Sequence, residues 1–217
     1  MADERRPVSD DRAVEYEALV ERLRERGHLS SDRVADALGA VPRHEFLPEG
    51  IRSRAYEDRP LSIGNGQTVS APHMVAMMCE LLPAEAVDVL EVGTGCGYHA
   101  AVTAECVDGT VYSVEYDADL AATARDAFER LGYDDRIAVR IGDGREGWAE
   151  HAPFDCVYCT CAVPEVPDAL RTQVRVGGRL VAPVGTGRQT LVTLDKRAEG
   201  SFERADHGGV RFVRIRG

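Results

Sequence analysis

Lysine is almost absent from this sequence of 217 residues: Lys196 is the only one, and every other basic residue is an arginine. Acidic residues are in excess, with 37 Asp and Glu against 26 Lys and Arg and a formal net charge of −11. A surface with this charge repels nucleic-acid phosphates and anionic lipids. We therefore expect neither nucleic acid nor a membrane surface as a partner.

The excess of carboxylates combined with the scarcity of lysine has two explanations. Acidic surfaces stay hydrated at high salt, so the composition favours adaptation to a saline environment. A GC-rich genome could by itself replace lysine by arginine. The sequence leaves both explanations open, and only the first predicts that stability depends strongly on salt.

Long apolar runs are also missing, since none approaches the roughly 18–20 residues that a membrane-spanning helix needs. The first residues, MADERRPVSDDR, are charged and lack the apolar core of a secretory signal. The six cysteines lie mostly in apolar segments, and the Cys-x-x-Cys pair Cys156 and Cys159 has no second pair at zinc spacing. We expect a cytoplasmic protein with reduced cysteines packed in its core and no metal site.

The length of the chain suits one sizeable α/β domain. Residues 1–12 are expected to form a flexible tail and residues 13–217 a single domain. Its first part, residues 13–84, has apolar positions at helical spacing within 14–26 and a second helix near 30–41, with Ser31 as a candidate N-cap. Residues 41–72 are rich in Pro and Gly, and Pro72 can start a following helix. This part is expected to be a helical cap with a substrate loop.

From residue 85 onward, short apolar runs alternate with helical patterns. Such alternation indicates a parallel sheet covered on both faces, and two final strands without a helix between them indicate an antiparallel hairpin. The fold class is therefore α/β, with a doubly wound, mostly parallel seven-stranded sheet that binds a cofactor. The expected strands are 87–92, 110–115, 137–142, 154–160, 178–184, 189–195 and 209–215, and the expected helices are 98–106, 118–131 and 166–174.

The segment VLEVGTGCGYHAA places Gly93, Gly95 and Gly97 between a buried strand and a helix. Glycines allow the backbone to approach a ligand closely, and the helix N-terminus offers free N–H groups. A dinucleotide fingerprint would require its third glycine at position 98, where Tyr98 stands instead. With Glu91 just upstream, the pattern suits a nucleoside with an amino-acid tail.

Acidic residues end the next two strands. Glu115 ends the strand VYSVE, and a carboxylate there can accept hydrogen bonds from ribose hydroxyls. Asp143 lies in GDG after the third strand, beside the same crevice. A glycine turn can be only a tight turn, and a strand-end acid is often a plain surface carboxylate. The three signals in order nevertheless predict a nucleoside-cofactor site.

The motifs EVGTGCG, VEYD and GDG resemble those of class I S-adenosylmethionine-dependent methyltransferases. The segments VPRHEFLP, AYEDRPLSIGNGQTVSAPHMVA, PFDCVY, GGRLVAPVG and VRFV narrow the resemblance to the protein-L-isoaspartate O-methyltransferase family, from about residue 14 to the C-terminus. The resemblance implies S-adenosylmethionine as cofactor and methylation of the free α-carboxylate of isoaspartyl residues in damaged proteins, which starts their repair. The enzyme is expected to be a monomer.

The resemblance also assigns residues. Ser70, in GQTVSAPHM, matches the family's active-site serine. The cofactor contacts carry over to Glu91, Gly93, Gly95, Gly97, Glu115, Asp143 and Gly144, and the substrate contacts to Thr68, Val69, His73, Val210, Phe212 and Val213. The family's C-terminal segment VxFVPL reads VRFVRI here, so Arg214 and Ile215 replace a Pro-Leu pair.

Other interpretations of these residues remain open. Ser70 could be only an N-cap for the following helix, and His73 a helix-start or packing residue. Trp148 either packs in the core or lies near an adenine, and the arginine-rich end RFVRIRG is most simply a solvated edge strand. Two other functions are also considered: methylation of an aspartate in a dedicated peptide during maturation, and a non-catalytic, cofactor-binding adaptor that recognises damaged protein ends. An adaptor is expected to carry an additional recruitment domain.

Overall fold

The computed structural model describes residues 10–217. Helix α1, Asp10–Glu25, already includes residues 10–12, which were expected in a flexible tail; the rest of that expectation lies outside the described residues. Helix α2, Asp32–Ala40, begins as predicted, because the Ser31 side chain accepts a hydrogen bond from the Val34 N–H. Two short 3-10 helices follow, η1 at Arg43–Phe46 and η2 at Glu49–Arg54.

The segment between residues 61 and 69 is a small antiparallel hairpin rather than the irregular loop that its composition suggested. Strand β1, Leu61–Gly64, pairs with strand β2, Gln67–Val69. Asn65 and Gly66 form the turn, and both have positive φ angles, 50° and 70°. Asn-Gly is the preferred pair for such a turn, since each residue tolerates this backbone conformation. Helix α3, Pro72–Glu80, then begins with Pro72 in its first turn, as predicted.

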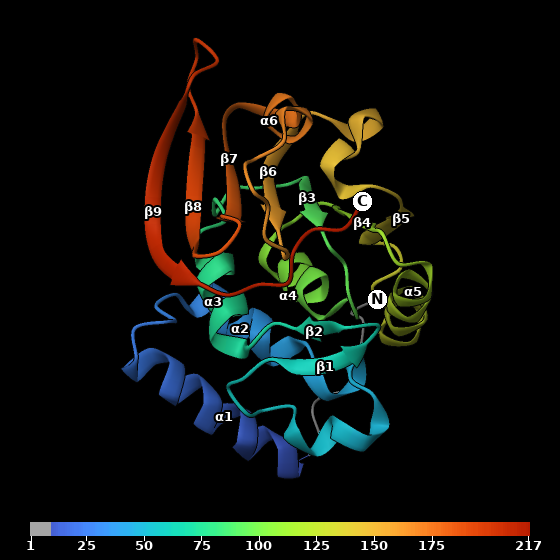
Figure 1. Ribbon diagram of the computed structural model, residues 1–217. Helices are drawn as coiled ribbons and strands as arrows, with labels where there is room; N and C mark the ends of the chain where they lie inside the picture. The colour runs from blue at the N-terminus through green and yellow to red at the C-terminus, as the bar shows by residue number, and fades with distance from the viewer. Residues whose placement is uncertain (1–9) are drawn as a thin grey trace.

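The main sheet has seven strands in the order β5-β4-β3-β6-β7-β8-β9, which confirms the predicted fold class. Strands β3 to β7 pair in parallel, and β8 runs antiparallel to both β7 and β9. Figure 1 shows the hairpin β1–β2 beside the ends of the central strands. The strands are β3 Val89–Val92, β4 Val111–Glu115, β5 Ile137–Ile141, β6 Phe154–Cys159, β7 Val174–Val184, β8 Gln189–Lys196 and β9 Phe202–Val210.

Helices cover both faces of this sheet. Alternate strand residues contribute to two apolar clusters, as expected for strands buried on both sides. One cluster packs the sheet against α4 (Tyr98–Cys106), α5 (Ala118–Leu131) and the N-terminal helices. The other packs it against α6 (Asp168–Gln173), and Trp148 contributes to it, with its ring near Tyr112 and His151. The two remaining 3-10 helices are η3 at Gly144–Glu146 and η4 at Ala149–His151.

The end of the chain differs from the prediction. The last strand is Phe202–Val210 and not 209–215, and its side chains are mostly exposed. Residues 211–217, which we call the C-terminal strap, leave the sheet edge and cross over the ends of the parallel strands (Figure 1). The Ala162 N–H donates to the Val213 carbonyl at 2.8 Å, and the Ile215 N–H donates to the Ala162 carbonyl at 2.9 Å. The solvated edge strand expected here is therefore wrong, because Val213 and Ile215 pack onto the second cluster instead.

All six cysteines are buried and free, as their apolar surroundings predicted. Burial raises the pKa of Cys156 to about 12, so this thiol stays protonated at neutral pH. Among residues 10–217, no helix is both long and apolar enough to cross a membrane.

The acidic composition gives a first prediction, which concerns salt. Carboxylates in excess repel one another at low ionic strength, and dissolved salt screens this repulsion. We expect the melting temperature to rise by several degrees between low and molar potassium chloride. Sodium sulfate at matched ionic strength separates screening from a general salting-out effect. A melting temperature that is flat or falls in potassium chloride would contradict adaptation to salt.

Candidate functional site

The glycine loop after β3 is built for close approach of its backbone to other groups. Gly93 has a φ of 100°, and a Cβ at this position would lie 2.4 Å from the Thr160 hydroxyl oxygen. No larger residue therefore fits. Gly95 has a φ of 56°, and Gly97, also at positive φ, is the N-cap of α4. The loop thus places the free N–H groups of a helix N-terminus at the ends of the parallel strands.

Glu115 ends strand β4 directly beside this loop. One of its carboxylate oxygens accepts a hydrogen bond from the Gly95 N–H at 2.8 Å, and the other accepts one from the Asp117 N–H at 2.9 Å. Only 8% of the surface of Glu115 is exposed. An ionised carboxylate has about four acceptor positions, so two remain for the hydroxyls of a ligand. The position fits the predicted contact with a ribose.

A small cavity lies between the glycine loop, Glu115 and the C-terminal strap. Its volume is about 70 Å³, whereas ligand pockets for small molecules usually have about 300 Å³ or more. Four of the predicted cofactor residues line it: Gly93, Gly95, Glu115 and Gly144. A Cβ on Gly144 would lie 2.4 Å from a methyl carbon of Val92, so glycine is required here too. The hydrogen-bonding groups of this lining therefore fit a nucleoside, although the cavity must widen to admit one.

A set of polar contacts joins the segments beside this cavity. Arg216 of the strap donates to the Asn65 carbonyl in the β1–β2 turn at 2.5 Å and lies 3.5 Å from the Asp117 carboxylate. The Asn65 side-chain amide donates to both Asp117 oxygens, at 3.1 and 3.0 Å. All of these contacts are near the surface and individually weak. Asn65, Asp117 and Arg216, which we call the clip, therefore join the hairpin, the start of α5 and the strap through weak contacts.

Glu91 was expected to contact the cofactor, but its side chain is fully buried beneath the glycine loop. It accepts hydrogen bonds from the hydroxyls of Ser113 at 2.5 Å and Tyr158 at 2.8 Å. Ser113 in turn bonds to Thr94 within the loop, at 2.5 Å. Burial raises the pKa of Glu91 to about 8, although these two hydrogen bonds act to lower it. The residue thus supports the loop from below, and a direct ligand contact stays a prediction.

The raised pKa of Glu91 predicts a pH dependence of stability. An unfolded chain ionises this carboxyl near its ordinary pKa of 4.5, whereas the folded protein ionises it only near 8. The unfolded state therefore gains relative stability as the pH rises between these values. Glu91→Gln removes this pH dependence. The free energy of unfolding of the variant, relative to that of the wild type, should therefore be higher at pH 8 than at pH 5. Urea unfolding of both proteins at both pH values measures this, and the same variant-to-wild-type difference at pH 5 and pH 8 would contradict the assignment.

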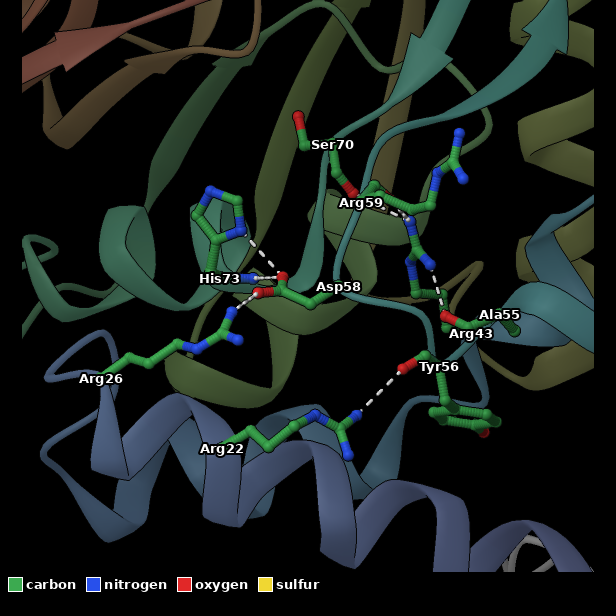
Figure 2. A network of polar contacts seen from close by, with 9 residues as sticks. All are labelled: Arg22, Arg26, Arg43, Ala55, Tyr56, Asp58, Arg59, Ser70 and His73. Carbon is green, nitrogen blue, oxygen red and sulfur yellow. Dashed lines mark hydrogen bonds and ion pairs between the residues drawn. The ribbon is translucent and has the colours of Figure 1, made fainter.

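Ser70 lies between β2 and α3 and lines a different cavity from the glycine loop. The N-cap of α3 is Ala71, and no side chain of that residue caps the helix. Asp58 performs this task instead, because its carboxylate accepts from the His73 N–H at 2.9 Å and contacts the His73 ring nitrogen at 2.8 Å (Figure 2). Within residues 10–217 the Ser70 hydroxyl has no hydrogen-bond partner, so the alternative that Ser70 is an N-cap is wrong.

Arg43 holds the backbone of Ser70 in place. This arginine is only 1% exposed, and its guanidinium donates to the carbonyls of Ser70 at 3.0 Å, Arg59 at 3.5 Å and Ala55 (Figure 2). Burial lowers the pKa of Arg43, and nearby Tyr98 partly offsets this. The two terminal nitrogens of the buried cation donate to carbonyl oxygens from three loop positions, which fixes these segments against one another, whereas Nε has no partner among the described residues. Arg43 is therefore a positioning residue for Ser70.

A larger cavity of about 910 Å³ opens on the Ser70 side. Six predicted residues line it: Thr68, Ser70, His73, Val210, Phe212 and Val213. Phe212 is held by Gln189, whose side chain exchanges hydrogen bonds with the Phe212 backbone at 2.6 and 3.0 Å. Four residues line both this cavity and the smaller one, so the two adjoin: Thr68, Thr160, Val213 and Arg214.

The structure thus brings most of the sequence-predicted residues to two adjoining cavities. Val69, Glu91, Gly97 and Asp143 line neither, and their predicted contacts stay predictions. Val69 packs in the core, because β2 alternates its side chains between two faces. Asp143 caps η3 and pairs with Arg145 at 2.6 Å, and hydrogen bonds from that arginine lower the pKa of Asp143.

Sequence reasoning missed Arg43, Asp58 and Thr160. Arg43 and Asp58 stand in quoted segments, VPRHEFLP and AYEDRPLS, but a charged residue in a loop shows no sign of its distant backbone partners. Thr160 follows β6, the fourth strand end at the same edge of the sheet, where its hydroxyl donates to the Gly93 carbonyl at 2.5 Å. The rule that ligands bind at strand ends could have found it.

Comparison with known proteins gives a consistent result. The family model for protein-L-isoaspartate(D-aspartate) O-methyltransferase matches residues 14–217. Relatives of this chain are named protein-L-isoaspartate O-methyltransferase. One, from Archaeoglobus fulgidus, is 50% identical over 93% of this chain and 92% of its own chain. Another, from Stenotrophomonas maltophilia, is 49% identical over 90% of this chain and 86% of its own chain.

Solved structures agree with these relatives. One of a protein-L-isoaspartate O-methyltransferase superposes with a TM-score of 0.85, at 33% identity over 93% of this chain and 66% of that chain. Another, a Plasmodium falciparum protein described as in complex with S-adenosyl-L-homocysteine, has a TM-score of 0.81 at 23% identity, over 93% of this chain and 98% of its own, and supports the fold. The chain belongs to the protein-L-isoaspartate(D-aspartate) O-methyltransferase family, whose enzymes use S-adenosylmethionine.

Proposed function

We propose that this protein methylates the free α-carboxylate of isoaspartyl residues where its two cavities adjoin. The observation that carries this proposal is the Ser70 hydroxyl, which lacks a partner within residues 10–217 and lines the larger cavity. The glycine loop and Glu115 line the smaller one, and both cavities share Thr68 and Thr160. Methyl donor and acceptor would then approach each other from opposite sides of this shared wall.

The chemistry at this wall requires little from the protein. The α-carboxylate of an isoaspartyl residue has an ordinary pKa of roughly 3.5, so it is already an anion at neutral pH and needs no general base. When bound, S-adenosylmethionine supplies a methyl group on a sulfonium cation. The leaving group departs as a neutral thioether, so the transfer needs no general acid. Alignment of the reacting atoms and exclusion of water are the remaining tasks.

Each of the described groups fits one of these tasks. The Ser70 hydroxyl donates to one carboxylate oxygen and orients it without adding a charge, and Arg43 keeps the Ser70 backbone fixed. Glu115 accepts hydrogen bonds from the ribose and so sets the position of the methyl donor. The strap lines the smaller cavity and the clip ties it to the hairpin and α5, so these segments limit the access of water.

The larger cavity suits a peptide better than a free amino acid, because its volume of about 910 Å³ lies near the upper end of ordinary ligand pockets. Family membership favours repair of damaged proteins over maturation of a dedicated peptide or an adaptor role, since relatives about 50% identical carry the repair enzyme's name. Isoaspartyl proteins are the proposed partners. A monomeric state and a cytoplasmic location stay predictions.

An aged protein substrate tests this function. The enzyme is incubated with S-adenosylmethionine labelled in its methyl group and with a protein stored until isoaspartyl residues accumulate. We expect label in an ester that mild alkali releases, and a falling isoaspartyl content over repeated cycles. Label that resists alkali, or equal labelling of fresh and aged protein, would contradict the proposal.

A further inference from the structure

The larger cavity carries a charge opposite to that of the whole chain. Its lining contains three arginines and no Asp or Glu, although the chain has a net charge of −11. Arg188 lies in the turn between β7 and β8, whereas Arg211 and Arg214 lie on the C-terminal strap, and all three are exposed. Positive charge is thus gathered around the place where the proposed acceptor enters.

These arginines have no carboxylate partners within residues 10–217. The side chains of Arg188 and Arg211 form no hydrogen bond or ion pair with described residues, and the Arg214 side chain donates only to the Thr186 carbonyl, at 2.5 Å. Most other described arginines form ion pairs with Asp or Glu. In a chain so rich in acids, unpaired arginines at one cavity leave their positive charge available to a ligand.

We infer that this enzyme prefers isoaspartyl residues with Asp or Glu close by in the sequence. The inference rests on the proposed function and names the substrate class of the same site. Extended peptide rises about 3.3 Å per residue, so the neighbours of an acceptor beside Ser70 come within reach of the cavity rim. Carboxylates of those neighbours then pair with Arg188, Arg211 and Arg214. The departure from the family segment at Arg214 contributes to this specificity.

The preference should appear in binding rather than in the chemical step. The arginines contact flanking residues and not the reacting atoms, so they stabilise the ground state and the transition state equally. KM should therefore change while kcat stays nearly constant. Because the arginines are exposed, the preference should also shrink as salt screens the pairs.

A peptide series tests the inference. Each peptide contains one isoaspartyl residue in a Gly and Ala background, with Glu, Gln or Lys at one position from three residues before to three after it. At low ionic strength we expect kcat/KM for the best Glu peptide to exceed that of its Lys twin by about tenfold, as summed exposed pairs would give. Anisotropy of labelled peptides with S-adenosyl-L-homocysteine present gives the Kd independently of turnover.

Charge reversal separates this specificity from the function itself. The double variant Arg188→Glu, Arg211→Glu should favour the Lys peptides over the Glu peptides, measured as the ratio of their kcat/KM values within the variant. Arg204→Glu, an exposed change on β9 away from both cavities, should keep the wild-type preference. Equal kcat/KM for Glu, Gln and Lys peptides, or an unchanged preference in the double variant, would overturn the inference alone. Methylation of no peptide in the series would overturn the proposed function and the inference with it.

Discussion

Replacing Ser70 by alanine should lower kcat on an isoaspartyl peptide by about 10²-fold, the loss typical of a missing orienting hydrogen bond at a reacting group. The affinity for S-adenosylmethionine should stay the same, because Ser70 lines the larger cavity and not the smaller one. Stability should also change little, since Asp58 caps helix α3 and the Arg43 contact involves the Ser70 backbone oxygen.

Three measurements separate this role from others. Calorimetry gives the cofactor affinity, steady-state kinetics give kcat and KM, and thermal unfolding gives stability. Ser62→Ala is a matched control, because Ser62 lies exposed on β1 and lines neither cavity. If turnover and cofactor affinity fall together, or if neither falls, Ser70 does not align the acceptor.

Replacing Glu115 by alanine should weaken S-adenosylmethionine binding by about 2–3 kcal/mol, which corresponds to about 30- to 150-fold. The variant loses the acceptor for the ribose hydroxyls. It also leaves the N–H groups of Gly95 and Asp117 without their partner, so the glycine loop becomes less fixed. Both effects act on the cofactor and not on the peptide cavity.

Calorimetry with S-adenosyl-L-homocysteine measures the change without turnover. Glu115→Gln keeps one acceptor oxygen and should lose less affinity than the alanine variant. Glu129→Ala removes an exposed carboxylate on α5 and should have no effect. An unchanged Kd in folded Glu115→Ala would contradict the assignment of this residue to the ribose.

The sequence predicted the parallel part of the fold well because local signals there agree. Helix α5 spans the predicted residues 118–131, since Asp117 accepts hydrogen bonds from the first turn and Gly132 ends the helix at a φ of 74°. Strands β3, β4 and β6 are buried on both faces and therefore read as apolar runs. Their order fixes which loops meet at the site.

The hairpin β1–β2 and the strand β9 were missed for different reasons. Strands of four and three residues are too short to show an alternating pattern, although the Asn65-Gly66 pair is itself a hairpin signal. Strand β9 is mostly polar and exposed, and its pairing with β8 specifies it more than its own apolar residues do. Val213 and Ile215, which follow it in the strap, pack onto the second apolar cluster instead.

The candidate site shows a similar limit. Short motifs predict where a backbone loop and a strand-end acid lie, so Gly93, Gly95 and Glu115 were found. They do not show which side chain is buried below the loop, as Glu91 is, or which distant cation holds a serine, as Arg43 does. Such contacts depend on packing between segments far apart in the chain.

The most direct test of the central claim is methyl transfer to one isoaspartyl peptide and to its twin with a normal aspartyl residue at the same position. Both peptides have the same composition and charge, so only the connectivity at the acceptor differs. We expect rapid formation of an alkali-labile methyl ester on the isoaspartyl peptide and almost none on the twin. Equal methylation of both peptides, or methylation of the normal one alone, would contradict the account.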